Sequence, residues 1–106
     1  MVRKEKIAMN IETIKNSNAL TISLSGRLDT TTAPQLEAAL KTALNGIETF
    51  VLDFTALEYL SSAGLRVLLA AQKVMNKQGV MIVRNVNDTI REIFDVTGFC
   101  DILTIE

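Results

Sequence analysis

Residues 50–68 read FVLDFTALEYLSSAGLRVL. The apolar run at 50–54 predicts a buried strand, and the apolar residues that follow recur at helical spacing and predict a helix from about Ser62 to Lys77. Two serines, Ser61 and Ser62, are therefore expected where a strand ends and a helix begins. The first N–H groups of a helix are unpaired and carry partial positive charge. A hydroxyl at that point can cap the helix, act as a nucleophile or carry a phosphate.

The segments on either side alternate between strands and helices. Periodicity and turn residues predict strands at 10–15, 19–25, 49–54, 80–83 and 102–105, with Gly26 ending the second of them. Capping and stop residues mark the helices between them: Thr32 and Gln35 as a capping box, Asn45–Gly46 as a stop, Asn87 or Asp88 as a cap, and Gly98 as a stop. The order β-β-α-β-α-β-α-β predicts an α/β domain over residues 9–106, with a mixed sheet that is parallel in its centre. Residues 1–8 are expected to be an N-terminal extension.

The composition is that of one domain without a membrane segment. The chain has 106 residues, 48% of them hydrophobic, and no apolar run approaches the length of a membrane span. The charged start of the chain, Met1–Lys6, lacks the apolar core of a signal peptide, so the cytoplasm is the expected location. A formal charge of −1 gives no general attraction to nucleic acid.

The chain has no histidine, which removes several kinds of chemistry. Nucleophiles activated by histidine, histidine phosphotransfer and the usual zinc sites are excluded. The single cysteine, Cys100, excludes an internal disulfide and a multi-cysteine metal site, and we expect it to be a small buried hydrophobe near the last strand. We therefore expect neither a metal ion nor another cofactor.

Two chemical roles at the serine turn fit the residues poorly. Ser62 stands two residues before Gly64, as in a nucleophile elbow, but Leu60 replaces that motif's first glycine and no histidine can act as the base. Asp53 could accept a phosphoryl group as in receiver domains, yet the first hairpin lacks the acidic pair that would hold magnesium. Asp53 is instead expected to bind backbone donors in the following loop. A binding module is predicted, not an enzyme, and the serines remain open to helix capping or to phosphorylation by another protein's kinase.

Two segments resemble a known family. The segment VLDFTALEYLSSAGLRVLL, residues 51–69, resembles the signature of the STAS domain family and, more narrowly, of the bacterial anti-sigma factor antagonists. The segment GRLDTTTA, residues 26–33, is similar to the family's second marker, the loop before the first helix. The resemblance covers about residues 10–105 and implies a small mixed sheet with helices packed mainly on one side.

The resemblance also implies a phosphorylation switch. In that family the unphosphorylated antagonist captures an anti-sigma factor that is itself a serine kinase, which frees the sigma factor. The kinase phosphorylates a serine at this helix start and ends the interaction, and a metal-dependent serine phosphatase restores it. By position the phosphoacceptor is Ser62, with Ser61 as a competing acceptor where many members carry aspartate. Ala63 stands where many carry serine or threonine, and Asp29 matches the acidic residue that lies beside the phosphoacceptor.

The expected partner-binding surface follows from these positions: Asp29, Thr30, Ser61, Ala63, Gly64 and Arg66. The expected partners are an anti-sigma factor serine kinase and a serine phosphatase, with no direct contact to nucleic acid or membrane. One alternative is an accessory subunit of a membrane transporter or a signalling scaffold. Another is a nucleotide-binding sensor, although no glycine-rich phosphate loop supports it.

Overall fold

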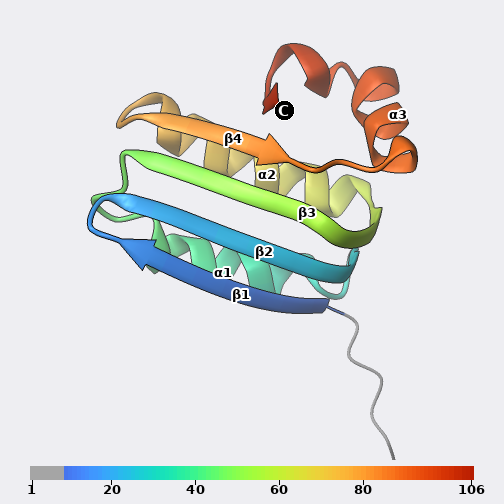
Figure 1. Ribbon diagram of the computed structural model, residues 1–106. Coiled ribbons are helices and arrows are strands. Elements are labelled where there is room, and N and C mark those ends of the chain that lie inside the picture. Colours follow the sequence, from blue (N-terminus) through green and yellow to red (C-terminus); the bar gives the residue numbers. More distant parts are fainter. Residues whose placement is uncertain (1–8) are drawn as a thin grey trace, which may run out of the picture.

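A five-stranded sheet runs through the protein, with its strands in the same order in space as in the chain. The computed structural model describes residues 9–106, and the expected extension at 1–8 lies outside this range (Figure 1). The elements are β1 (Met9–Asn16), β2 (Ala19–Leu28), α1 (Ala33–Ala43), β3 (Thr49–Leu60), α2 (Ser62–Asn76), β4 (Val80–Arg84), α3 (Asp88–Thr97), a 3-10 turn (Phe99–Asp101) and β5 (Thr104–Ile105). Within residues 9–106, no helix is long and apolar enough to cross a membrane.

The sheet is mixed, as predicted. Strands β1 and β2 form an antiparallel hairpin, whose turn residue Ser17 has a φ of 57°. Strands β2, β3, β4 and β5 pair in parallel, which the helical crossovers between them require. The register places Leu20, Phe50 and Met81 side by side in one buried row across the sheet. The predicted α/β class and element order are confirmed.

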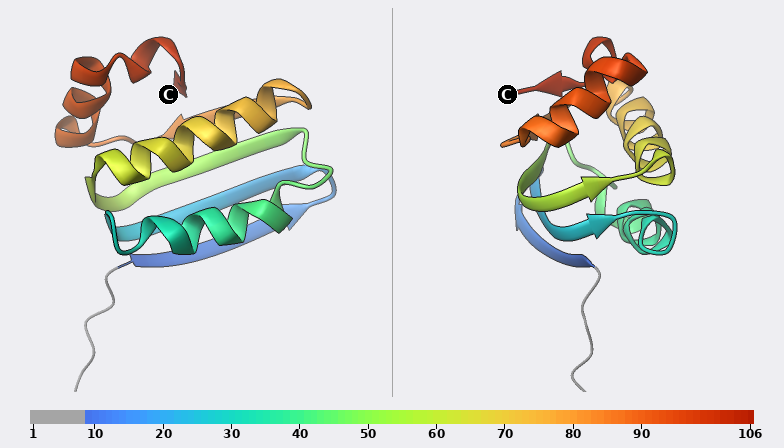
Figure 2. Two further views of the ribbon diagram at one scale, coloured as in Figure 1. Left: turned by 180° about the vertical axis from the view of Figure 1, so that it is seen from behind. Right: turned by 90° about the vertical axis from the view of Figure 1, so that its right-hand side faces the viewer.

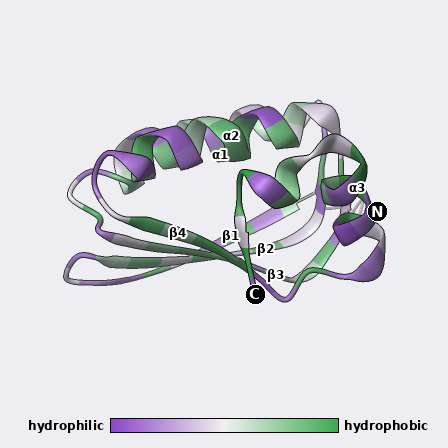
Figure 3. Cartoon of the chain, turned by 90° about the horizontal axis from the view of Figure 1, so that it is seen from above, coloured by the Kyte–Doolittle hydropathy of each residue, from purple (hydrophilic) through white to green (hydrophobic). Residues whose placement is uncertain are grey.

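Helices α1 and α2 lie side by side over one face of the sheet, while α3 lies at its end (Figures 2 and 3). Strand alternation directs Leu20, Ile22 and Leu24 of β2 toward these helices, and all three are buried. Each such side chain contributes roughly 1.5–3 kcal/mol when fully buried. The core is completed by Leu36 and Leu40 of α1, Leu68 and Met75 of α2, Phe50, Leu52 and Phe54 of β3, and Ile90 and Phe94 of α3.

Strand β3 is longer than the pattern predicted, because β2 and β3 pair through two register shifts. The shifts lie between Ser23 and Ser25 and between Gly26 and Arg27. Gly26 has a φ of 90°, a conformation that favours glycine, and it therefore bends β2 without ending it. Beyond Phe54 the buried residues of β3 recur at every third position. A search for strands by alternating apolar and polar residues therefore does not detect this part of β3.

The C-terminal third combines confirmed helix ends with a shorter last strand. Asn87 caps α3 by accepting the Ile90 backbone N–H at 2.8 Å, and Gly98 ends the helix with a φ of 79°. The predicted strand at 102–105 is wrong in length, since only Thr104–Ile105 pairs with β4.

Cys100 differs from its predicted burial. It belongs to the 3-10 turn, is only partly buried, and donates its thiol to Asp95 at 2.7 Å. This bond raises the pKa of the Cys100 thiol, so the neutral form is favoured at neutral pH.

Candidate functional site

The turn between β3 and α2 holds two adjacent serines in opposite environments. Ser61 is the N-cap residue of α2, with φ −97° and ψ 174°, and its hydroxyl is buried without a hydrogen-bond partner in the described protein. Ser62 is the first residue of the helix and is exposed to solvent. Helix capping, one of the two roles left open for these serines, is not observed, because no side chain makes a cap hydrogen bond to this helix. Ser62 thus presents the only accessible hydroxyl of the pair.

The first turn of α2 leaves backbone donors free. Its first helical hydrogen bond runs from the Leu65 N–H to the Ser61 carbonyl at 3.0 Å. The N–H groups of residues 62–64 therefore have no acceptor within the helix, and no cap replaces one. Together with the helix dipole, these donors favour negative charge close to Ser62.

The loop between β2 and α1 is held together by Asp29. One oxygen of its carboxylate accepts the Thr31 N–H at 3.0 Å, the Thr31 hydroxyl at 2.8 Å and the Thr32 N–H at 3.2 Å. These bonds, first among them that of the Thr31 hydroxyl, lower the pKa of Asp29, so the residue is ionised at neutral pH. The other oxygen lies 3.6 Å from Nε of Arg27. Asp29 thus shapes its own loop.

Thr32 fixes the base of the same loop. Its buried hydroxyl donates to the Arg27 carbonyl at 2.8 Å and accepts the Asp29 N–H at 2.8 Å. The predicted capping box with Gln35 is wrong, because the hydroxyl bonds backward to β2 and makes no cap bond to α1. Pro34 does lie in the first turn of α1, where its missing N–H costs little.

The two loops meet at the end of the sheet. The Ser61 N–H donates to the Leu28 carbonyl at 2.9 Å. Gly64 in the first turn of α2 is buried, and a Cβ at that position would lie 2.7 Å from Cγ of Leu28 and 2.6 Å from Cδ1 of Leu60. The expectation that Gly64 is part of the partner-binding surface is therefore corrected: it lets the start of α2 approach β2 and β3 closely.

A hollow of about 190 Å³ opens between the starts of α1 and α2. It is lined by Thr30, Ala33, Pro34, Glu37, Ala63, Arg66 and Val67. Three of the predicted surface residues, Thr30, Ala63 and Arg66, meet here, whereas Asp29 and the two serines lie outside its lining. The sequence pattern missed Glu37 and Val67, because their meeting depends on how α1 packs beside α2.

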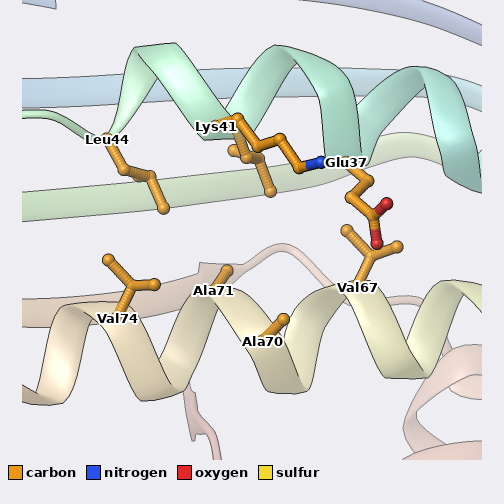
Figure 4. A pocket seen from close by; sticks show the side chains of 8 residues that line it. Glu37, Lys41, Leu44, Val67, Ala70, Ala71 and Val74 are labelled. Carbon is orange, nitrogen blue, oxygen red and sulfur yellow. The ribbon is translucent and has the colours of Figure 1, made fainter.

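A larger apolar groove of about 290 Å³ continues between the same two helices (Figure 4). Its lining is Glu37, Leu40, Lys41 and Leu44 from α1, and Val67, Ala70, Ala71 and Val74 from α2. Glu37 and Val67 line both depressions, so the groove and the hollow adjoin. One side of the molecule therefore offers a continuous concave strip that begins near the turn at Ser62.

Other polar contacts in this region serve structure. The Arg27 guanidinium lies 4.3 Å from the ring centroid of Tyr59, its neighbour in the sheet register, a contact that the sequence did not reveal. Asp53 lies within β3 and not at its end, and accepts the Thr55 N–H at 2.9 Å. The expected bond to a backbone donor is therefore found, but the expectation that this donor lies in a following loop is wrong, because Thr55 belongs to β3. Across residues 9–106, no three cysteine or carboxylate side chains gather in a way that could hold a metal ion.

Comparison with known proteins agrees with the observed fold. Residues 10–106 match the STAS domain family. A Bordetella bronchiseptica protein named as an anti-sigma factor antagonist is 35% identical over 99 residues, covering 92% of this chain and 85% of that protein. The anti-sigma-B factor antagonist of Bacillus subtilis is 26% identical over 98 residues, covering 92% of this chain and 90% of its own. Among solved structures, an anti-sigma factor antagonist from Mycobacterium paratuberculosis has a TM-score of 0.82 at 26% identity, covering 92% of this chain and 84% of that one. The chain belongs to the STAS domain family.

Proposed function

We propose that this protein is an anti-sigma factor antagonist whose binding to an anti-sigma factor serine kinase is switched off by phosphorylation of Ser62. Relatives that are named anti-sigma factor antagonists match nearly the whole chain. The observation that carries the proposal is the contrast between the exposed Ser62 and the buried hydroxyl of Ser61. A kinase must reach its acceptor oxygen from solvent, and this contrast favours Ser62.

The fold tolerates a phosphate at Ser62. Phosphorylation adds a charge of about −1.5 to −2 and three acceptor oxygens. The free N–H groups of residues 62–64 and the helix dipole both favour that charge. Because Ser62 is exposed, the modified side chain displaces nothing from the core. The domain therefore keeps its shape while one point of its surface becomes strongly negative.

The same phosphate opposes a partner pressed against the turn. Burying an uncompensated dianion at an interface costs several kcal/mol, and each 1.4 kcal/mol is a factor of ten in affinity. A tight complex is lost without any change in the backbone. The protein then acts as a binding module in the cytoplasm, and a serine phosphatase returns it to the binding state.

Phosphate mapping tests the site. The purified protein is incubated with its cognate anti-sigma factor kinase and ATP, and the products are digested with trypsin. Both serines fall on one peptide, Thr42–Arg66, so fragmentation must place the phosphate. We expect it on Ser62, with Ser61→Ala a good substrate and Ser62→Ala unmodified. Continued phosphorylation of Ser62→Ala on this peptide would overturn the assignment.

A further inference from the structure

We infer that Arg66 is the second component of the switch: it is free for the partner while Ser62 is unmodified, and phosphate on Ser62 captures it. The inference rests on the proposed phosphorylation of Ser62. The inference adds a second effect of modification: the phosphate adds negative charge to the binding surface and also pairs with the positive charge of Arg66, which is then not free for the partner. An acidic group on the anti-sigma factor is then the feature that Arg66 recognises.

The helical spacing places the two residues together. Ser62 and Arg66 are both residues of α2, four positions apart, and side chains at this spacing lie on the same face with their Cβ atoms about 5–6 Å apart. Both are exposed, so a phosphate and a guanidinium can meet without entering the core. The negative group lies N-terminal to the positive one, which is the favourable order along a helix.

Arg66 is the uncommitted cation of this surface. Among residues 9–106 it makes no ion pair, although it shares the hollow with Glu37. The neighbouring cation, Arg27, is held by Asp29 at 3.6 Å and by the Tyr59 ring. Arg66 is therefore the cation that we expect a phosphate on Ser62 to meet. The net charge of the pair Ser62 and Arg66 changes from +1 to between about −0.5 and about −1 on modification.

The phosphate itself reports the contact. Phosphoserine is installed at position 62 of the full chain by stop-codon suppression, and its second ionisation is followed by ³¹P NMR at low salt. A nearby guanidinium stabilises the dianion, so we expect this pKa to be lower in the parent protein than in Arg66→Gln, by at least about 0.2 pH unit. Arg66→Lys should keep part of the shift. Lys73→Gln is the matched control, because Lys73 is an exposed cation in the last turn of the same helix.

The other charged groups near this end of α2 are unchanged in every variant: Glu37 on α1, Asp29 before it, Arg27 on β2 and Glu58 on β3. Their effect on the phosphate cancels when the parent is compared with Arg66→Gln. An equal pKa in these two proteins would overturn the capture of Arg66. It would leave the assignment of Ser62 intact, because the titration needs no kinase.

Binding of the unmodified protein tests the other half of the inference. Arg66→Gln should bind the cognate anti-sigma factor at least fivefold more weakly than the parent protein, while Lys73→Gln should bind equally well. If Arg66→Gln binds as tightly as the parent, Arg66 has no role toward the partner and the second component of the switch is lost. The mapping experiment with the kinase separately decides whether Ser62 is modified at all.

Discussion

The backbone N–H of Ser61 donates to the carbonyl of Leu28 at 2.9 Å, and this bond joins the two loops of the candidate site. Leu28 is the last residue of β2 and Ser61 follows the last residue of β3, so the bond continues the sheet pairing by one step. The bond therefore ties the two loops together in the protein without a partner. If this surface binds the proposed partner, we expect the binding to require little ordering of the backbone.

Replacing Ser62 by glutamate should separate binding from folding. Ser62→Glu places a negative charge at the turn and is expected to weaken binding to the cognate anti-sigma factor at least tenfold, about 1.4 kcal/mol. Ser62→Ala should bind within twofold of the parent protein. Titration calorimetry with the purified anti-sigma factor measures both affinities.

Urea denaturation is the control for these two variants. Ser62 is exposed, so both substitutions should change the free energy of unfolding by no more than about 0.5 kcal/mol. A weakened Ser62→Glu that remains fully folded supports the switch. Unchanged affinity for Ser62→Glu would contradict it.

Gly64→Ala should destabilise the domain. The added Cβ would lie 2.7 Å from Cγ of Leu28 and 2.6 Å from Cδ1 of Leu60, and both leucines are fully buried. Overpacking of this kind costs about 1–3 kcal/mol in the free energy of unfolding, measured by urea denaturation. Leu60→Ala makes room, so the double variant should lose less stability than the sum of the two single variants. Simple additivity would show that the contact with Leu60 is not the cause.

The sequence could predict α2 because all of its signals are local. The apolar residues recur at helical spacing, and Ser62 and Gly79 bracket the segment, so the predicted range 62–77 differs from Ser62–Asn76 by one residue. The end of β3 could not be read in this way. Its buried residues Phe54, Leu57 and Leu60 follow bulged pairing with β2, and only the partner strand determines that spacing.

In the candidate site, too, the residues in local motifs could be predicted from the sequence, whereas those placed by the packing of distant segments could not. Thr30, Ala63 and Arg66 were predicted from loop motifs, and the structure gathers them in one hollow. Glu37 and Val67 were missed, because the packing of α1 beside α2 places them there. The role of the Thr32 hydroxyl was predicted wrongly for a related reason: it bonds to the Arg27 carbonyl of β2 and the Asp29 N–H, and not to an N–H of the helix that follows.

Thr32→Val should loosen the loop that carries Asp29. Valine keeps the shape of threonine but leaves the Arg27 carbonyl and the Asp29 N–H without their shared partner. A buried group left unpaired costs about 1–3 kcal/mol, which urea denaturation detects. Thr30→Val is the matched control, since Thr30 is exposed two residues away, and it should change stability by about 0.5 kcal/mol or less. If Thr32→Val and Thr30→Val lowered the stability equally, the Thr32 hydroxyl would have no special role in holding the loop.

Asp53 should give the stability a specific dependence on pH. Its carboxylate accepts the Thr55 hydroxyl at 2.6 Å, the Thr55 N–H at 2.9 Å and the Asn85 amide at 3.1 Å. These bonds, led by that of the Thr55 hydroxyl, lower the pKa of Asp53 in the folded state. A lowered folded pKa means that the stabilisation is complete above the unfolded value of about 3.9 and is lost as the pH falls through the folded value.

Asp53→Asn tests this contribution, because asparagine can still accept from Thr55 but carries no charge. We expect the parent protein to be more stable than Asp53→Asn at pH 7, and the difference in urea midpoint to shrink progressively below about pH 4. Thr55→Val, which removes the main donor, should raise the pKa of Asp53 toward its ordinary value in a ¹³C NMR titration. If the difference in urea midpoint between the parent protein and Asp53→Asn stays constant from pH 7 to pH 2.5, the effect is due to packing. An effect of the ionised carboxylate would disappear when Asp53 is protonated.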